Sequence, residues 1–168
     1  AMAYLDDCIG RFIDRLKRTP QWENTLIILL PDHGIFYPEG ISDTNERKSH
    51  IPLIWTGGVV AKARKIDKIC NQTDLAATLL GQMGLPHDDF TFSRDVMSRS
   101  YTHPSAVHVW SEGIYWKDAT GISVVNLMTK PESVFREAPQ PSTLRVNAAK
   151  AFLQTCYDYL QGEKPAAR

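Results

Sequence analysis

The chain has 168 residues, of which 43% are hydrophobic and 23% charged, and its 19 basic and 19 acidic side chains give a formal net charge of zero. This length suits one domain with a buried core, and the composition is that of a globular chain. The balanced charge gives no reason to expect nucleic acid as a partner, and no apolar run approaches the ~20 residues that cross a bilayer. The chain itself is therefore expected to be soluble.

The first third of the chain predicts one helix and two strands. Apolar residues recur at helical spacing from about residue 3 to residue 18, and Pro20 stops the pattern. Residues 25–30 form an apolar run without alternation, which predicts a strand buried on both faces. A polar loop follows over residues 35–49, and residues 51–56 predict a second buried strand. A loop of this length more often has a functional role than serves only as a connection.

The remainder predicts a helix, a meander of strands and a final helix. Thr73 as N-cap and Gly84 just past the end bound a helix over residues 74–83. Three short runs predict an antiparallel meander: 106–110, 114–117 and 122–128. A last helix over 142–162 carries one apolar stripe of Leu144, Ala148, Phe152, Cys156 and Leu160, and residues 163–168 are expected to be frayed.

The first apolar strand leads directly into a carboxylate and an imidazole, Asp32 and His33, followed by Gly34. In open α/β sheets, ligands gather outside the carboxyl ends of such strands. Adjacent side chains point to opposite sides of an extended strand, so both can reach one ion only if the chain turns, which Gly34 makes easy. One oxygen and one nitrogen donor suit Zn²⁺ or Mn²⁺ better than Ca²⁺. Asp and His beside Gly are also common turn residues, and that reading stays open.

Three further residues of the polar loop have functional interpretations. His50 precedes the second strand, and it would meet His33 only if the two strands lie close together, as sequential elements usually do. A histidine at such a position is otherwise a hydrogen-bonded loop residue. Arg47 and Lys48 are able to bind a substrate anion, or they are simply solvated.

A series of sequence pieces resembles the alkaline phosphatase superfamily and, within it, the sulfatase-like lipoteichoic acid synthase and phosphoglycerol transferase branch. The pieces agree in order and spacing over about the first hundred residues: Tyr4–Lys17, Trp22–Ile28, Asp32–Gly34, His50–Trp55, Gln72–Leu80 and Phe90–Asp95. The stretch from Val107 to Leu127 resembles the close of the domain in bacterial members. For residues 1–162 this resemblance implies an α/β fold: part of an alkaline-phosphatase-like sheet flanked by helices, then the meander and terminal helix.

The resemblance also implies a catalytic function, and it implies that part of the catalytic site lies outside this chain. Family members transfer phosphoryl or sulfuryl groups of ester substrates with a divalent metal, which Asp32 and His33 would share with an upstream acidic residue and with the nucleophile. In some relatives a histidine placed like His50 meets substrate phosphate or a second metal. The nucleophile is a threonine, or a modified cysteine or serine, far upstream of the Asp-His-Gly element. We therefore expect the C-terminal part of a larger catalytic domain, inactive by itself, whose partner is the upstream part.

Relatives of this branch are usually anchored in the membrane with an extracytoplasmic catalytic domain, and the resemblance implies the same for the parent enzyme. The alternative is a non-catalytic binding or assembly module that reuses this half-domain, with Asp32 and His33 in structural roles. In either case an exposed sheet edge predicts self-association.

Overall fold

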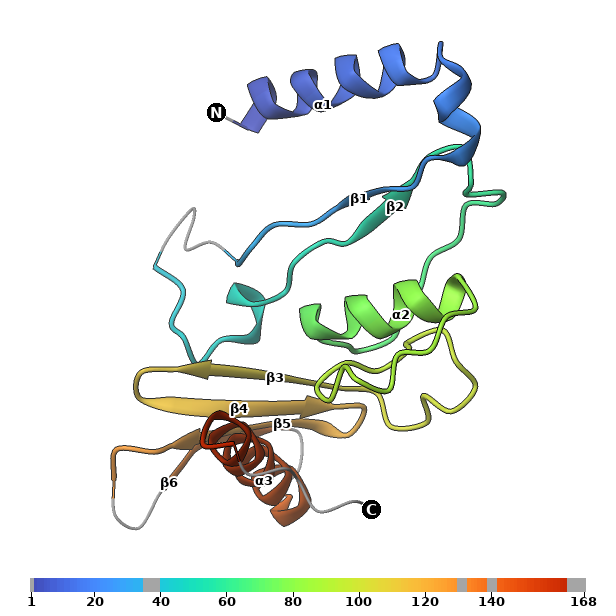
Figure 1. Cartoon of the computed structure of the whole chain (residues 1–168). Coiled ribbons are helices and arrows are strands. Elements are labelled where there is room, and N and C mark those ends of the chain that lie inside the picture. Colours follow the sequence, from blue (N-terminus) through green and yellow to red (C-terminus); the bar gives the residue numbers. More distant parts are fainter. Residues whose placement is uncertain (1, 35–39, 130–132, 139–141, 163–168) are drawn as a thin grey trace. The chain divides into compact units, whose positions relative to one another are not determined.

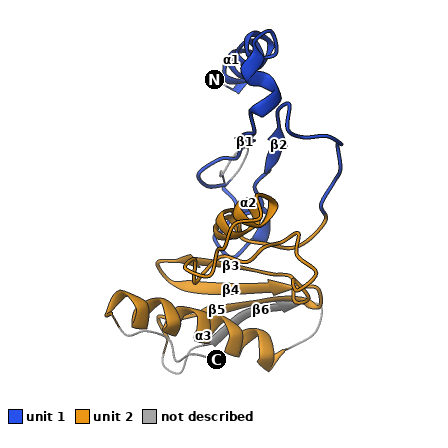
Figure 2. Cartoon of the chain, turned by 45° about the vertical axis from the view of Figure 1, so that its right-hand side comes forward, with its two compact units in different colours: residues 1–66 blue, residues 67–168 orange. Residues whose placement is uncertain are grey.

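The computed structural model describes residues 2–34, 40–129 and 142–162, together with the backbone of residues 133–138. Residues 35–39 of the predicted loop and the predicted frayed tail lie outside this description. Helices combine with two antiparallel sheets, and the strands of the second sheet follow one another directly before the last helix (Figure 1), so the predicted α/β class with a C-terminal meander and helix is confirmed. The chain divides into two compact units, residues 1–66 and residues 67–168 (Figure 2). Among the described residues, no helix has the length and hydropathy needed to span a membrane.

Unit 1, residues 1–66, contains one long helix and two short strands. Its elements are α1 (Met2–Leu16), the 3-10 turn η1 (Pro20–Asn24), β1 (Ile27–Leu29), the 3-10 turn η2 (Glu46–Lys48) and β2 (Ile54–Thr56). The two strands pair antiparallel, with Ile28 opposite Trp55. Each strand is shorter than predicted. Pro31 and Pro52 explain this, because proline has no N–H to donate to a sheet ladder.

The expectation that both strands are buried on both faces is wrong. All three residues of β1 are half-buried, and Leu53 and Ile54 are 47% and 53% exposed. Two strands alone leave their faces and outer edges without a covering layer. The continuous apolar sequence of β1 and β2 therefore forms surface that unit 1 does not itself cover.

Helix α1 is amphipathic and has no buried residue. Leu5 and Phe12, which belong to its apolar stripe, are 60% and 51% exposed. An amphipathic helix gains most of its stability from packing its apolar face against a partner. In this chain the apolar face of α1 lacks that partner over the described residues.

Two glycines after β2 allow a close approach of the backbone. Gly57 has a φ of +124°, and a Cβ there would overlap the carbonyl oxygen of Thr25. A Cβ on Gly58 would overlap the carbonyl oxygen of Trp22. The segment that follows β2 is thus packed directly on the backbone of η1 and of the residues before β1.

Unit 2, residues 67–168, opens with the 3-10 turn η3 (Gln72–Asp74) and helix α2 (Leu75–Gln82). The prediction of Thr73 as N-cap is wrong, because the N-cap of η3 is Asn71 and that of α2 is Asp74. Asn71 and Asp74 form a capping box, in which the Asp74 carboxylate accepts from the Asn71 N–H at 2.9 Å. Gly84 follows the helix with a φ of +69°, as its predicted position past the end requires.

Asp74 is also the centre of a buried ionic network. It is 1% exposed and accepts hydrogen bonds from the Arg94 backbone N–H at 2.9 Å, from Nε at 3.1 Å and from Nη2 at 2.9 Å. Arg94 also donates from Nη1 to the Ser105 hydroxyl at 2.8 Å. Burial acts to lower the pKa of Arg94, but the hydrogen bond and charge of Asp74 raise it above its ordinary value. This network joins the segments before α2, after α2 and at the start of the meander.

Tyr101 packs on the same network. Its hydroxyl donates to the Ile69 carbonyl at 2.7 Å, and its ring centroid lies 5.0 Å from the guanidinium carbon of Arg94. Burial raises the pKa of Tyr101 to about 12, against the lowering effect of the Arg94 charge. The phenol is therefore held in its neutral form.

The meander is a four-stranded antiparallel sheet in chain order: β3 (Ser105–Trp110), β4 (Gly113–Asp118), β5 (Gly121–Asn126) and β6 (Ser133–Ala138). The three predicted strands are confirmed, and β6 is an additional strand that the sequence analysis did not find. Ile114 and Val125 face each other across β4 and β5 and are fully buried. Together with Ala149 of the terminal helix they form one core cluster of unit 2, and Tyr115, Ile122 and Val124 form another.

Helix α3 (Thr143–Leu160) begins at Ser142, whose hydroxyl accepts from the Arg145 N–H at 3.3 Å. The predicted apolar stripe is wrong at both ends, because Leu144 and Leu160 are 81% and 80% exposed. The residue turned inward at the first turn is Arg145, which is 1% exposed.

Arg145 is buried because the meander supplies partners for its charge. Its Nε donates to the Ser123 hydroxyl at 3.0 Å and its Nη1 to the Thr120 hydroxyl at 2.6 Å, with Asp118 Oδ1 at 3.8 Å. Burial acts to raise the pKa of Asp118, but hydrogen bonds from Thr120 and the charge of Arg145 lower it. A guanidinium thus joins α3 to the turn between β4 and β5.

Candidate metal-binding site

The predicted ligands lie just beyond the carboxyl end of β1. The chain leaves the strand at Leu29, passes Pro31 and bends at Asp32 and His33. Because β1 and β2 run antiparallel, the end of β1 lies beside the start of β2. The segments after β1 and before β2 therefore share one end of the strand pair.

The bend brings the two side chains together. The Asp32 Oδ2 and His33 Nε2 atoms are 3.6 Å apart, and Asp32 Oδ1 accepts from the His33 backbone N–H at 3.0 Å. His33 Nδ1 lies 2.6 Å from the Gly34 carbonyl oxygen, so Nδ1 carries the proton in this contact. In the neutral imidazole the lone pair is then on Nε2, the atom that faces the carboxylate.

This donor pair fits a divalent metal ion. Zn–N and Zn–O bonds of about 2.0–2.2 Å in a tetrahedral site put two donor atoms about 3.3–3.6 Å apart. A histidine ligand whose other ring nitrogen donates to a carbonyl is the usual arrangement in metal sites. The Asp32 and His33 side chains are 88% and 79% exposed, so their donor atoms are accessible. Across the described ranges, no third Cys, His, Asp or Glu completes a ligand group with them.

Gly34 serves the site through its lack of a side chain. A Cβ at this position would overlap the Lys48 carbonyl oxygen, so Gly34 and η2 are in direct backbone contact. The sequence suggested that Gly34 helps the chain to turn. The bend itself lies at Asp32 and His33, and the glycine permits the close approach of η2.

His50 lies between η2 and β2, and its side chain is exposed. The sequence predicts that His50 meets His33 only if the two strands lie close together. The pairing of β1 with β2 fulfils this condition. Its role toward substrate or a second metal stays a prediction.

Lys48 is a weaker candidate for binding substrate than its sequence suggested. Its ammonium group forms an ion pair with Asp43, and its side chain is 14% exposed. Arg47, beside it, is exposed. The structure thus separates two residues that the sequence could not distinguish.

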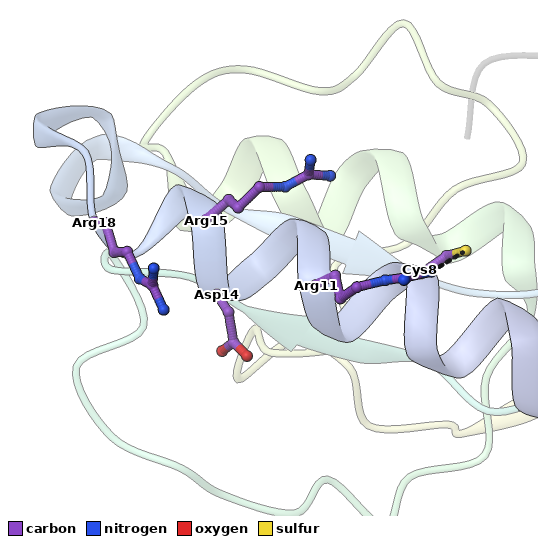
Figure 3. A pocket seen from close by; sticks show the side chains of 5 residues that line it. All are labelled: Cys8, Arg11, Asp14, Arg15 and Arg18. Carbon is purple, nitrogen blue, oxygen red and sulfur yellow. Dashed lines mark hydrogen bonds between the residues drawn. The ribbon is translucent and has the colours of Figure 1, made fainter.

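Two hollows lie outside this site. Figure 3 shows the first, of about 540 Å³, along α1, where Arg11, Arg15 and Arg18 line it with Cys8 and Asp14. The second, of about 360 Å³ in unit 2, brings together His87, Arg94 and His103, which the sequence analysis had not connected. Neither hollow contains Asp32, His33 or His50.

Comparison with known proteins identifies relatives of both units. The sulfatase family model matches residues 1–85, which include α1, both strands and Asp32–His33. A sulfatase from Formosa agariphila is 33% identical over 90 residues, which cover 50% of this chain and 17% of that protein.

A crystal structure of a protein in the alkaline phosphatase superfamily from Vibrio parahaemolyticus has the same fold. It superposes with a TM-score of 0.73 at 20% identity, over 95% of this chain and 41% of that one. The chain thus spans less than half of the length of either relative. It belongs to the sulfatase family and has the fold of a part of an alkaline phosphatase superfamily domain.

Proposed function

We propose that this chain supplies half of the catalytic site of a metal-dependent enzyme that transfers sulfuryl or phosphoryl groups. Asp32 and His33 are the proposed ligands of a divalent ion, Zn²⁺ or Mn²⁺. The nucleophile and the remaining ligands come from parts of the parent domain outside this chain. The observation that carries the proposal is the 3.6 Å separation of Asp32 Oδ2 and His33 Nε2.

Each residue of the site has a separate task in this proposal. Asp32 contributes a negative charge, and His33 contributes the Nε2 lone pair that its Nδ1 contact with Gly34 leaves available. His50 is proposed to meet substrate oxygens or a second ion. The bound metal would lower the pKa of a hydroxyl nucleophile and neutralise charge on the transferring group.

The substrate and the surroundings of the parent enzyme are proposed from the sequence pieces that resemble the synthase and phosphoglycerol transferase branch. They favour a phosphate or sulfate ester as substrate and an extracytoplasmic domain anchored in the membrane. The exposed apolar faces of α1 and β2 are proposed to pack on the rest of the domain. Without that covering, we expect the chain to self-associate, and sedimentation that shows a strict monomer at high concentration would contradict this.

Metal binding is tested by adding Mn²⁺ to the 168-residue chain and recording the paramagnetic broadening of its NMR signals. We expect weak binding that broadens the His33 ring and the Gly34 amide first. Asp32→Asn and His33→Gln should abolish this broadening. His87→Gln and Asp88→Asn are matched controls, because they alter an adjacent histidine and aspartate in a turn of unit 2.

Broadening that persists in Asp32→Asn, or that centres on His87 or His103, would reject the ligand assignment and favour the binding-module alternative. The absence of a nucleophile has its own test, in which the chain is assayed with p-nitrophenyl sulfate and bis(p-nitrophenyl) phosphate. We expect no appreciable turnover. Turnover that disappears in Asp32→Ala would show that the nucleophile lies within this chain.

A further inference from the structure

The turn before β2 contains four charged residues in six positions: Asp43, Glu46, Arg47 and Lys48. Lys48 is ion-paired with Asp43, and Glu46 also has an interaction partner. Arg47 is exposed, and its guanidinium has no hydrogen bond or ion pair with any residue that the structure describes. Arg47 is thus the charge of this turn that is available to a ligand.

The backbone that carries Arg47 is held in place. The Asn45 side chain accepts from the Arg47 N–H at 3.0 Å, and the Lys48 N–H donates to the Asn45 carbonyl at 3.0 Å. The Ser49 N–H donates to the Glu46 carbonyl at 3.1 Å. A long side chain on a fixed backbone loses less freedom when it binds a ligand than one on a mobile loop.

This turn adjoins the proposed metal ligands. The Lys48 carbonyl is in contact with Gly34, which directly follows His33, and Arg47 directly precedes Lys48. The backbone of Arg47 is therefore one residue away from the contact between η2 and the segment that carries Asp32 and His33. The planar fork of N–H donors of its guanidinium matches two oxygens of a tetrahedral oxyanion.

We infer that Arg47 is a substrate-binding residue that holds the sulfate or phosphate group of the substrate. The inference rests on the proposed function, because it assumes that the transferring group lies beside Asp32 and His33. In this arrangement Lys48 is a positioning residue, since its pairing with Asp43 closes the turn that carries Arg47.

The test measures the binding of inorganic sulfate and, separately, inorganic phosphate to the full chain by NMR titration of the Arg47 amide and side-chain Nε–H. Sulfate is titrated with and without Mn²⁺, and phosphate without metal. We expect Arg47→Gln to weaken both anions about tenfold, the loss typical of a charge-assisted hydrogen bond, and Arg47→Lys to restore part of the affinity. Arg99→Gln, which alters an exposed arginine of unit 2, is the matched control and should change nothing.

The two proposals fail in different ways. If Mn²⁺ binds at His33 and Arg47→Gln leaves the sulfate and phosphate affinities unchanged, the role of Arg47 is overturned while the metal site stands. If neither anion shifts the Arg47 signals of the unaltered chain, the role of Arg47 is overturned as well. If the anions bind through Arg47 but Asp32→Asn does not alter Mn²⁺ binding, the metal assignment fails and Arg47 remains an anion site.

Discussion

The two units of this chain differ in what they contain: unit 2 has the buried core, and unit 1 has the candidate metal ligands. Among the described residues, all of the buried hydrophobic ones belong to unit 2, with Ile114 and Val124 fully inaccessible, and unit 2 holds its buried charges in hydrogen-bonded networks. Unit 1 contains the candidate ligands, and Gly57 is its only buried residue among those described. The difference teaches that the candidate ligands of this chain lie in the unit that has the smaller buried core. Unit 1 depends on packing that must come from outside it.

The largest expected effect is a core truncation in unit 2. Ile114→Ala should lower the free energy of unfolding by about 4 kcal/mol, because it opens a cavity between β4, β5 and α3. The comparison variant is Phe12→Ala on α1, where the side chain is 51% exposed and the expected loss is about 0.5 kcal/mol. Urea unfolding followed by circular dichroism measures both, and equal losses would contradict the division between the units.

A second comparison uses two aspartates. Asp74→Ala should lower the free energy of unfolding by about 3 kcal/mol. This value is near the low end for breaking a buried ion pair, because the Arg94 side chain that is left without its partner is 41% exposed. Asp32→Ala, which removes an 88% exposed side chain, should change stability by less than about 0.5 kcal/mol. Hydrogen exchange by mass spectrometry should show the Asp74→Ala loss in unit 2. A similar loss for Asp32→Ala would make Asp32 a structural residue.

Tyr101→Phe has a smaller effect that depends on pH. At neutral pH this substitution should lower the free energy of unfolding by about 1 kcal/mol, since it removes the hydrogen bond to the Ile69 carbonyl. The pKa of Tyr101 is raised from 10.0 to about 12 in the folded chain, so its neutral phenol contributes stability that is present below pH 10 and is lost between pH 10 and 12. The difference in free energy of unfolding between the unaltered chain and Tyr101→Phe should therefore become smaller from pH 10 to about pH 12. A difference that grows would contradict a raised pKa of Tyr101.

The last comparison concerns the candidate site itself. Gly34→Ala would place a methyl group onto the backbone carbonyl of Lys48, so one of the two backbone segments has to shift. The displaced backbone should weaken Mn²⁺ binding at Asp32 and His33 about tenfold, as loss of an orienting group does. Gly40→Ala is the matched control, because a Cβ there meets no atom within 4 Å. Equal Mn²⁺ affinity in the two variants would argue against this role of Gly34.

Local pattern was enough to predict most helices and strands, and long-range partners explain the errors. The face of α3 was assigned from Leu144, because hydropathy treats Arg145 as an outward residue. Its actual burial depends on Thr120 and Ser123, more than twenty residues earlier in the chain. For β1, the apolar run correctly indicated a strand, but the layers that would bury it are not provided by unit 1.

The candidate site shows the same limit. The sequence indicated Asp32 and His33 as neighbours of one ion, and their donor atoms lie 3.6 Å apart. No sequence signal linked Gly34 to the Lys48 carbonyl or distinguished Arg47 from Lys48, because both relations depend on the fold of the turn. Whether a metal binds there stays a prediction that the Mn²⁺ experiment tests.

The two glycines after β2 restrict how this sequence can drift over evolutionary time. Any side chain at Gly57 or Gly58 collides with a main-chain carbonyl rather than with a side chain that could be replaced to make room. A substitution of another side chain cannot make room at either position. Both should therefore remain glycine in any homologue that keeps the close approach between η1 and the segment after β2.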